Sequence, residues 1–129
     1  MNSYEETLWN RRINEAKIMW LNMISDGFRP GSVAAFELTF FTKASDDAQR
    51  LIDALAEHRY TAMVDEQMQQ GHYIIEGTSR PYAYDFNDQE FISWVEFMVN
   101  LGFQNNAVFA NWTTSCSEPD KSWDSQDIA

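Results

Sequence analysis

The sequence is poor in the residues that build a covalent or metal-dependent framework. Its 129 residues include one cysteine, Cys116, which excludes an internal disulfide, and only two histidines, too few with it for a convincing zinc site. No apolar run approaches the roughly 18 residues of a membrane-spanning helix, and the first residues lack a signal-peptide pattern. These absences predict a cytoplasmic protein without metal, cofactor or membrane partner.

Basic residues are also scarce, because nine lysines and arginines stand against twenty acidic residues, for a net charge of −11. Direct binding to nucleic acid is therefore disfavoured, since it requires basic side chains that neutralise phosphates. The charge instead favours encounter with a basic protein, although it can also serve solubility alone. The sequence contains no glycine-rich phosphate loop and no GxSxG or HExxH motif, so we expect no enzymatic activity.

Apolar residues are plentiful, at 44% with 15% aromatics, which predicts one folded core. Residues 1–27 are expected to form an N-terminal helix with Ser3 as N-cap and Glu6 completing a capping box. Its apolar stripe consists of Trp9, Ile13, Ala16, Trp20 and Met23. This stripe either packs on the domain's own sheet or presents Trp9 and Trp20 to a partner or a second copy of the chain.

Residues 32–115 alternate between strand and helix patterns. Phe36, Leu38 and Phe40 mark a first strand, and a helix with Ser45 as its N-cap leads into a second strand over 59–67. A third strand is predicted over 72–86, bent or broken at Gly77 and Pro81. A helix opens at Asn87 with Glu90 at its capping-box position, and a last strand ends near Ser115. The order predicts a ferredoxin-like βαββαβ fold, which is α+β with a four-stranded antiparallel sheet and both helices on one face.

Residues 116–129 are expected to leave the last strand as a mobile acidic tail. Trp123 has no apolar periodicity around it, so it is either incidental or a short linear anchor for a basic partner. Neither His58 nor His72 is expected near Cys116, which is therefore interpreted as an unreactive bystander. The candidate partner-binding residues are Trp9, Trp20, Asp65, Glu66, Trp112, Glu118, Asp120, Trp123 and Asp124.

Several strings between Asp26 and Ser115 resemble the family called regulator of ribonuclease E activity B. They are the Asp26-Gly27 pair, "FELTFF", "DDAQRLIDALAEHRYTAMVDE", "GHYIIEG", "DQEFISWVEFMVNLGF" and "NWTTS" with Trp112, Thr113 and Thr114. The resemblance implies a small acidic α+β protein that binds and restrains ribonuclease E without catalytic residues of its own. Many members carry a strongly acidic C-terminal extension, and the one here is shorter and milder.

Three classes of function remain open. The first is a non-enzymatic inhibitor of a basic nuclease, either a regulator of ribonuclease E or an immunity protein that neutralises a nuclease toxin. The second is a small ligand-binding or enzymatic domain whose sheet-face aromatics Phe41, Tyr73, Tyr82 and Trp112 line a pocket. The third is a homodimer built on the helix that carries Trp9 and Trp20, so the predicted state is a monomer or a weak homodimer.

Overall fold

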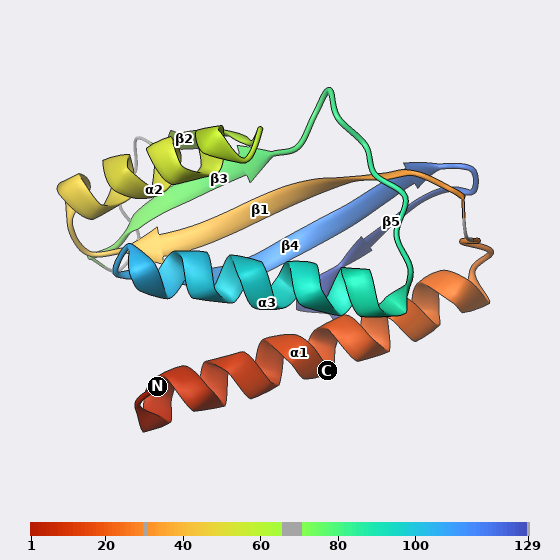
Figure 1. Cartoon of the computed structure of the whole chain (residues 1–129), viewed down its shortest axis with the longest axis horizontal. Helices are drawn as coiled ribbons and strands as arrows, with labels where there is room; N and C mark the ends of the chain where they lie inside the picture. Colours follow the sequence, from red (N-terminus) through yellow and green to blue (C-terminus); the bar gives the residue numbers. More distant parts are fainter. Residues whose placement is uncertain (30, 66–70, 129) are drawn as a thin grey trace.

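The computed structural model describes residues 1–29, 31–65 and 71–128 and shows an α+β protein (Figure 1). The elements are α1 (Ser3–Ser25), β1 (Ala34–Thr42), α2 (Ser45–Glu57), β2 (Thr61–Val64), β3 (Tyr73–Thr78), α3 (Asp88–Gln104), β4 (Ala107–Ser117), β5 (Asp120–Asp124) and the short 3₁₀ helix η1 (Ser125–Asp127). No helix among the described residues is both long enough and apolar enough to cross a membrane.

The strands form one open antiparallel sheet in the order β2-β3-β1-β4-β5. The expectation of four strands is wrong, because the end of the chain adds a fifth. The long strands β1 and β4 lie at the centre and pair along their length, with a register shift between Thr39 and Phe40. In an antiparallel pair such an irregularity bends the strand and increases its twist.

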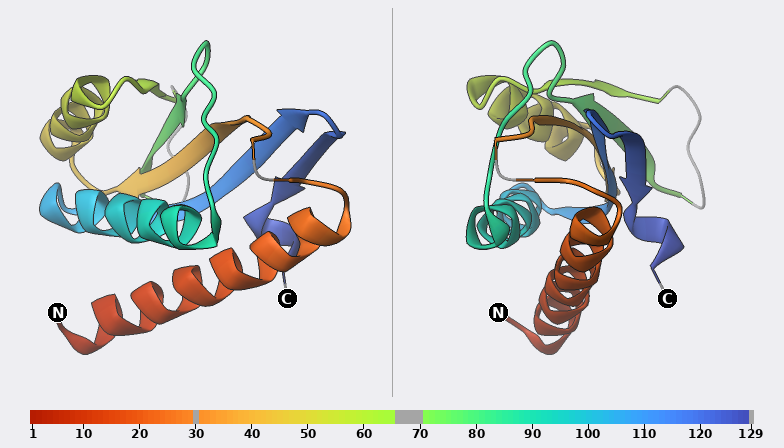
Figure 2. Two further views of the ribbon diagram at one scale, coloured as in Figure 1. Left: turned by 45° about the vertical axis from the view of Figure 1, so that its right-hand side comes forward. Right: turned by 90° about the vertical axis from the view of Figure 1, so that its right-hand side faces the viewer.

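The three helices lie on the same face of the sheet (Figures 1 and 2). α2 lies near the β2–β3 edge and α3 lies across the middle, and the two diverge so that part of β1 is visible between them. α1 runs beside α3 near the β4–β5 end. The N-terminal helix, whose position the sequence did not predict, therefore extends the helical layer.

The core lies between this helical layer and the sheet. Phe36, Leu38 and Phe40 alternate along β1 and are almost fully buried, as the pattern of the strand predicted. On α1, Ala16 and Met23 are buried, while Trp9, Ile13 and Trp20 are half-buried and pack against the core. The predicted stripe of the first helix is thus confirmed as a core-facing stripe.

Of the three N-caps predicted from the sequence, the structure confirms one and corrects two. Asn87 and Glu90 form the predicted capping box of α3, with the Asn87 side chain accepting the Glu90 N–H over 2.8 Å. In α1 the cap lies one residue earlier than predicted, because Asn2 rather than Ser3 pairs with Glu5. Asparagine is at least as good an N-cap as serine, so the sequence alone does not distinguish a cap at Asn2 from a cap at Ser3. Ser45 does not cap α2; it is the first helical residue and Ala44 precedes it.

The predicted mobile tail is also corrected, because residues 120–124 form β5. This strand pairs with β4 through a tight connection, with Trp123 opposite Thr114. The Trp123 side chain is only 8% exposed and meets Phe28 edge-on at 6.3 Å between ring centroids. The strand could not be predicted from the sequence around Trp123, because a five-residue edge strand with one apolar residue shows almost no alternation of apolar and polar residues.

Candidate ligand pocket

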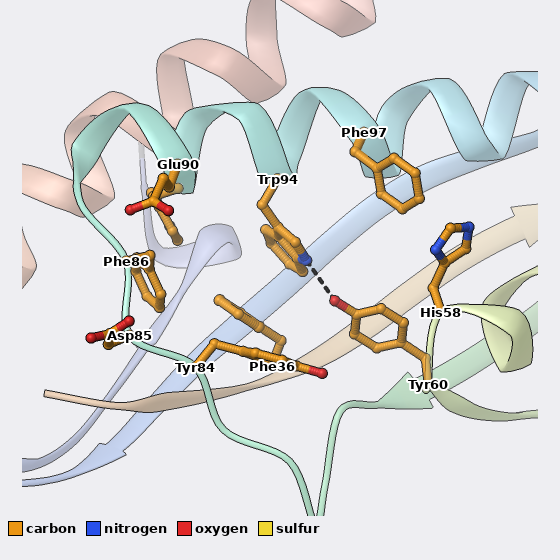
Figure 3. A pocket seen from close by; sticks show the side chains of 10 residues that line it. Phe36, His58, Tyr60, Tyr84, Asp85, Phe86, Glu90, Trp94 and Phe97 are labelled. Atoms are coloured by element: carbon orange, nitrogen blue, oxygen red, sulfur yellow. Dashed lines mark hydrogen bonds between the residues drawn. The ribbon is translucent and has the colours of Figure 1, made fainter. Parts of the chain in front are cut away.

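A pocket of about 330 Å³ opens on the helical side of the sheet, between α3, the connection that follows α2 and the segment that precedes α3 (Figure 3). It is rich in aromatic side chains and carries carboxylates at one end. The lining residues are Phe36, His58, Tyr60, Tyr84, Asp85, Phe86, Glu90, Phe91, Trp94 and Phe97. The size is at the lower end of the range of small-molecule sites, about 300–1,000 Å³.

Stacked aromatic rings form the base of the pocket. Phe36 from β1 stacks on Trp94 from α3 with 4.0 Å between centroids and 20° between planes. Phe86 stacks on Phe91 at 5.4 Å and 16°. Phe36, Phe86 and Phe91 are buried, whereas Trp94 is only half-buried, so an indole surface remains accessible beside a rigid apolar base.

One side of the pocket is held by a hydrogen bond between distant segments. The Trp94 Nε1–H donates to the Tyr60 hydroxyl over 2.8 Å, which joins α3 to the residue before β2 (Figure 3). Burial raises the pKa of Tyr60, and the neighbouring Tyr84 adds to the rise, while the bond from Trp94 opposes it. Tyr60 is therefore neutral at physiological pH and holds the Trp94 ring in place.

Two carboxylates, Asp85 and Glu90, stand at one end of the pocket (Figure 3). Both residues are exposed, and neither forms an ion pair within the described part of the chain. Glu90 Oε1 accepts the Asn87 N–H as part of the capping box, and the Asp85 carboxylate has no hydrogen bond to the described residues. This end of the pocket is therefore negative and open to solvent.

The opposite end carries His58 and Phe97. The His58 ring meets the Phe97 ring edge-on at 4.8 Å and 75°, and Phe97 is 38% exposed. His58 is the residue that follows α2. No lysine or arginine lines the pocket, and Arg59, the residue between His58 and Tyr60, instead lies over the Tyr82 ring.

The structure does not bring the predicted partner-binding residues into one surface. Trp112 is fully buried and Trp123 nearly so, which corrects their interpretation as accessible anchors. Trp9 and Trp20 are half-buried, and Trp20 meets the rings of Phe28, Phe86 and Phe91.

The predicted acidic residues are dispersed. Glu118 and Asp120 are exposed at the β4–β5 connection, and Asp124 caps η1 by accepting the Gln126 N–H. Asp65 follows β2 at the other edge of the sheet, and its neighbour Glu66 is outside the described residues.

The pocket itself was not predicted. The proposed set of Phe41, Tyr73, Tyr82 and Trp112 does not line it, because Trp112 packs into the core beside Phe109 and none of the other three reaches it. The "YAYDFN" segment, residues 82–87, combines aromatic and acidic residues and supplies three lining residues. That composition is the available signal, but the sequence predicts this segment as the end of the third strand, whereas β3 ends at Thr78.

Cys116 does not have the surroundings of a nucleophile. Its Sγ–H donates to the Pro119 carbonyl over 2.8 Å, and burial raises the pKa of the thiol. Within residues 1–29, 31–65 and 71–128, no group of three or more His, Cys, Asp or Glu side chains could hold a metal ion. Comparison with known proteins finds no family model that matches the chain and no curated protein with significant similarity to it.

Proposed function

We propose that this protein is a non-enzymatic inhibitor that binds a basic nuclease, with ribonuclease E as the first target to test. The proposal includes the assignment of β1–α2–β2–β3–α3–β4 to the ferredoxin-like class, with α1 and β5 as additions. The observation that carries it is the net charge of −11 on a chain whose charged side chains mostly remain on the surface. The resemblance in sequence supplies the choice of ribonuclease E.

The internal ion pairs leave much of this charge available. Arg12 pairs with Glu15, Arg80 with Glu37, Lys121 with Asp26 and Arg50 with Asp47. Acidic residues outnumber basic ones by more than two to one, so many carboxylates of the described residues lie outside these four ion pairs. Unpaired exposed carboxylates attract a basic protein over a distance set by the ionic strength.

A nuclease offers complementary chemistry, because its nucleic-acid cleft carries lysine and arginine side chains that neutralise phosphates. Carboxylates on this protein would take the place of the phosphates and cover the cleft. Electrostatic complementarity of this kind mainly accelerates association, while buried aromatic and arginine contacts determine how slowly the complex dissociates.

The test is cleavage of an RNA substrate by ribonuclease E from the organism that encodes this chain, with and without the full-length protein. We expect binding and inhibition at about 0.1 M salt and a marked loss near 1 M, where the screening length falls to ~3 Å. An unrelated protein of the same net charge is the control. Absence of both binding and inhibition at the lower salt overturns ribonuclease E as the target.

The proposal has one variant, and the pocket supports one alternative function. If a neighbouring gene encodes a nuclease toxin and this protein neutralises that toxin instead, the role is that of an immunity protein. The aromatic pocket favours a second candidate function, the binding of a small ligand. A thermal-shift screen with metabolites and metals tests it, and the absence of any stabilisation would contradict it.

A further inference from the structure

The lining of the pocket favours positive charge. Most lining residues are aromatic, and the two acidic ones form no ion pair with the described residues. Among the lining residues, only His58 can become positive. Aromatic ring faces and carboxylates both attract cations, because the ring quadrupole is negative above and below the plane. The same groups repel phosphate and carboxylate ligands.

We infer that this pocket receives an arginine side chain of the basic partner protein. The inference rests on the proposed function, and it names the contact that would anchor the complex. The planar guanidinium would lie against the part of the half-buried Trp94 indole that remains exposed, and the Asp85 carboxylate would accept its N–H groups.

The planarity and weak hydration of the guanidinium favour arginine over lysine. A guanidinium stacks on an aromatic ring and donates two parallel hydrogen bonds to one carboxylate, whereas an ammonium is a strongly hydrated point charge. The pocket has stacked rings at its base, and at its rim the Asp85 carboxylate can accept hydrogen bonds from the guanidinium. Glu90 contributes charge and its second oxygen, since Oε1 serves the cap of α3.

The position and size of the pocket also suit one side chain. At about 330 Å³ it is open to solvent rather than enclosed within the core, and Asp85, Glu90 and Phe97 of its lining are exposed. The rings at its base are packed by the core and Trp94 is held by Tyr60, so binding requires little ordering of the protein. A site that is already rigid loses less entropy when it binds a flexible side chain.

The direct test is an NMR titration of the full chain with three short peptides that differ at one central residue: arginine, lysine or the neutral, apolar norleucine. The Trp94 indole N–H resonance is the reporter, because that group lies at the pocket and bonds to Tyr60. The Trp123 indole N–H is the internal reference, because it bonds to Asp26 and does not line the pocket. We expect the arginine peptide to shift the Trp94 resonance in a saturable way and to leave Trp123 unchanged.

A matched pair of variants separates the local contact from the overall charge. Asp85→Asn and Asp88→Asn each remove one negative charge, and the two positions are three residues apart, but only Asp85 lines the pocket. We expect Asp85→Asn to weaken binding of the arginine peptide about three- to five-fold, the loss of one exposed ion pair. Asp88→Asn should change it by less than about two-fold.

Each other outcome overturns the inference. Equal binding of the norleucine peptide would make the pocket a general apolar site, and equal binding of the lysine peptide would remove the preference for arginine. Absence of a Trp94 shift with the arginine peptide would exclude a cation at this site. Equal losses for Asp85→Asn and Asp88→Asn would show that only the overall charge matters.

The ribonuclease E assay separates this inference from the proposed function. If Asp85→Asn binds the nuclease as tightly as the unmodified chain does, the inhibitor stands and the pocket is not its anchor. If the unmodified chain does not bind the nuclease but the arginine peptide occupies the pocket, the cation site stands and the proposed target fails. We expect the Asp85→Asn chain to lose affinity for both the peptide and the nuclease, and the Asp88→Asn chain for neither.

Discussion

Trp123 donates its indole N–H to the Asp26 carboxylate over 2.8 Å, and this hydrogen bond ties the last strand to the end of the first helix. The two residues are 97 positions apart in the chain. Lys121, on the same strand, lies 3.5 Å from the other oxygen of the same carboxylate. β5 is therefore part of the folded domain and not an appendage to it.

Replacement of Trp123 by alanine should destabilise the whole domain. Removing a buried tryptophan costs about 3–5 kcal/mol. The fold loses the free energy gained by burying the side chain, and the vacated space adds a cavity penalty. We expect a loss of that size in the free energy of unfolding, measured by urea titration. The control is Ser122→Ala on the same short strand, where the residue is exposed and the cost should be below about 1 kcal/mol. Equal stability of the two variants would show that β5 contributes no packing.

The Asp26 carboxylate should make stability fall in acid. The hydrogen bond from Trp123, with a smaller contribution from Lys121, holds the pKa of Asp26 below its ordinary value despite the opposing effect of desolvation. A lowered folded-state pKa stabilises the fold above the unfolded-state pKa of about 3.9, and the contribution is lost as the pH falls through the folded-state value.

The measurement is thermal unfolding between about pH 6 and pH 2.5, a window that brackets this titration. The Asp26→Asn variant keeps an acceptor for Trp123 but cannot titrate, so it should show a smaller decrease on acidification than the unmodified chain. Parallel pH profiles for the two chains would contradict a linkage through Asp26.

Tyr60→Phe should loosen the pocket without unfolding the protein. The Trp94 N–H would lose its acceptor in a half-buried position, at a cost of about 1–2 kcal/mol. Tyr82→Phe is the matched control, because Tyr82 is 45% exposed and its hydroxyl makes no hydrogen bond to the described residues. Unfolding free energies that do not differ between the two variants would show that the Trp94–Tyr60 bond carries no stability.

The same tyrosine should also limit stability in alkali. Burial raises the pKa of Tyr60 above its ordinary value, so the fold favours the neutral phenol. The resulting stability is fully present below the unfolded-state pKa of about 10 and is lost as the pH rises toward the folded-state value. Tyr60→Phe should therefore flatten the alkaline decrease of the melting temperature, and an unchanged slope would contradict this linkage.

Cys116 should react slowly with an alkylating agent. Burial raises the pKa of the thiol and its Sγ–H donates to Pro119, so little thiolate is present at neutral pH. We expect the rate of iodoacetamide modification of the native chain to be below that of a free cysteine and to rise with pH past about 8.5. The urea-unfolded chain is the control and should react at the ordinary rate. A native rate above the free-cysteine rate would indicate an activated thiol.

Local patterns were sufficient to predict most of the elements. The capping box at Asn87 and the alternation of Phe36, Leu38 and Phe40 are short-range signals, because both depend on residues within a few positions of one another. The chain order of the helices and the first four strands followed from such signals, as did the core-facing stripe of α1.

Local sequence patterns could not predict the candidate pocket. Phe36, Tyr60 and Trp94 belong to three segments with no periodic relation, and they meet because β1 lies beneath α3 and beside the connection after α2. The residues proposed from sequence depended on residue type and local spacing, which do not report exposure in the folded chain. Aromatic residues such as Trp112 serve a core as readily as an interface, so residue type does not distinguish the two.

The sequence by itself determined an acidic α+β chain, its succession of helices and strands, and the excess of negative charge that favours a basic partner. Only the tertiary structure decided the fifth strand, the burial of Trp123 and the aromatic pocket with Asp85 at its rim. The physical reason is separation along the chain. Composition and periodicity report what a segment prefers alone, while a short edge strand and a pocket exist only once distant segments supply their hydrogen bonds and packing partners.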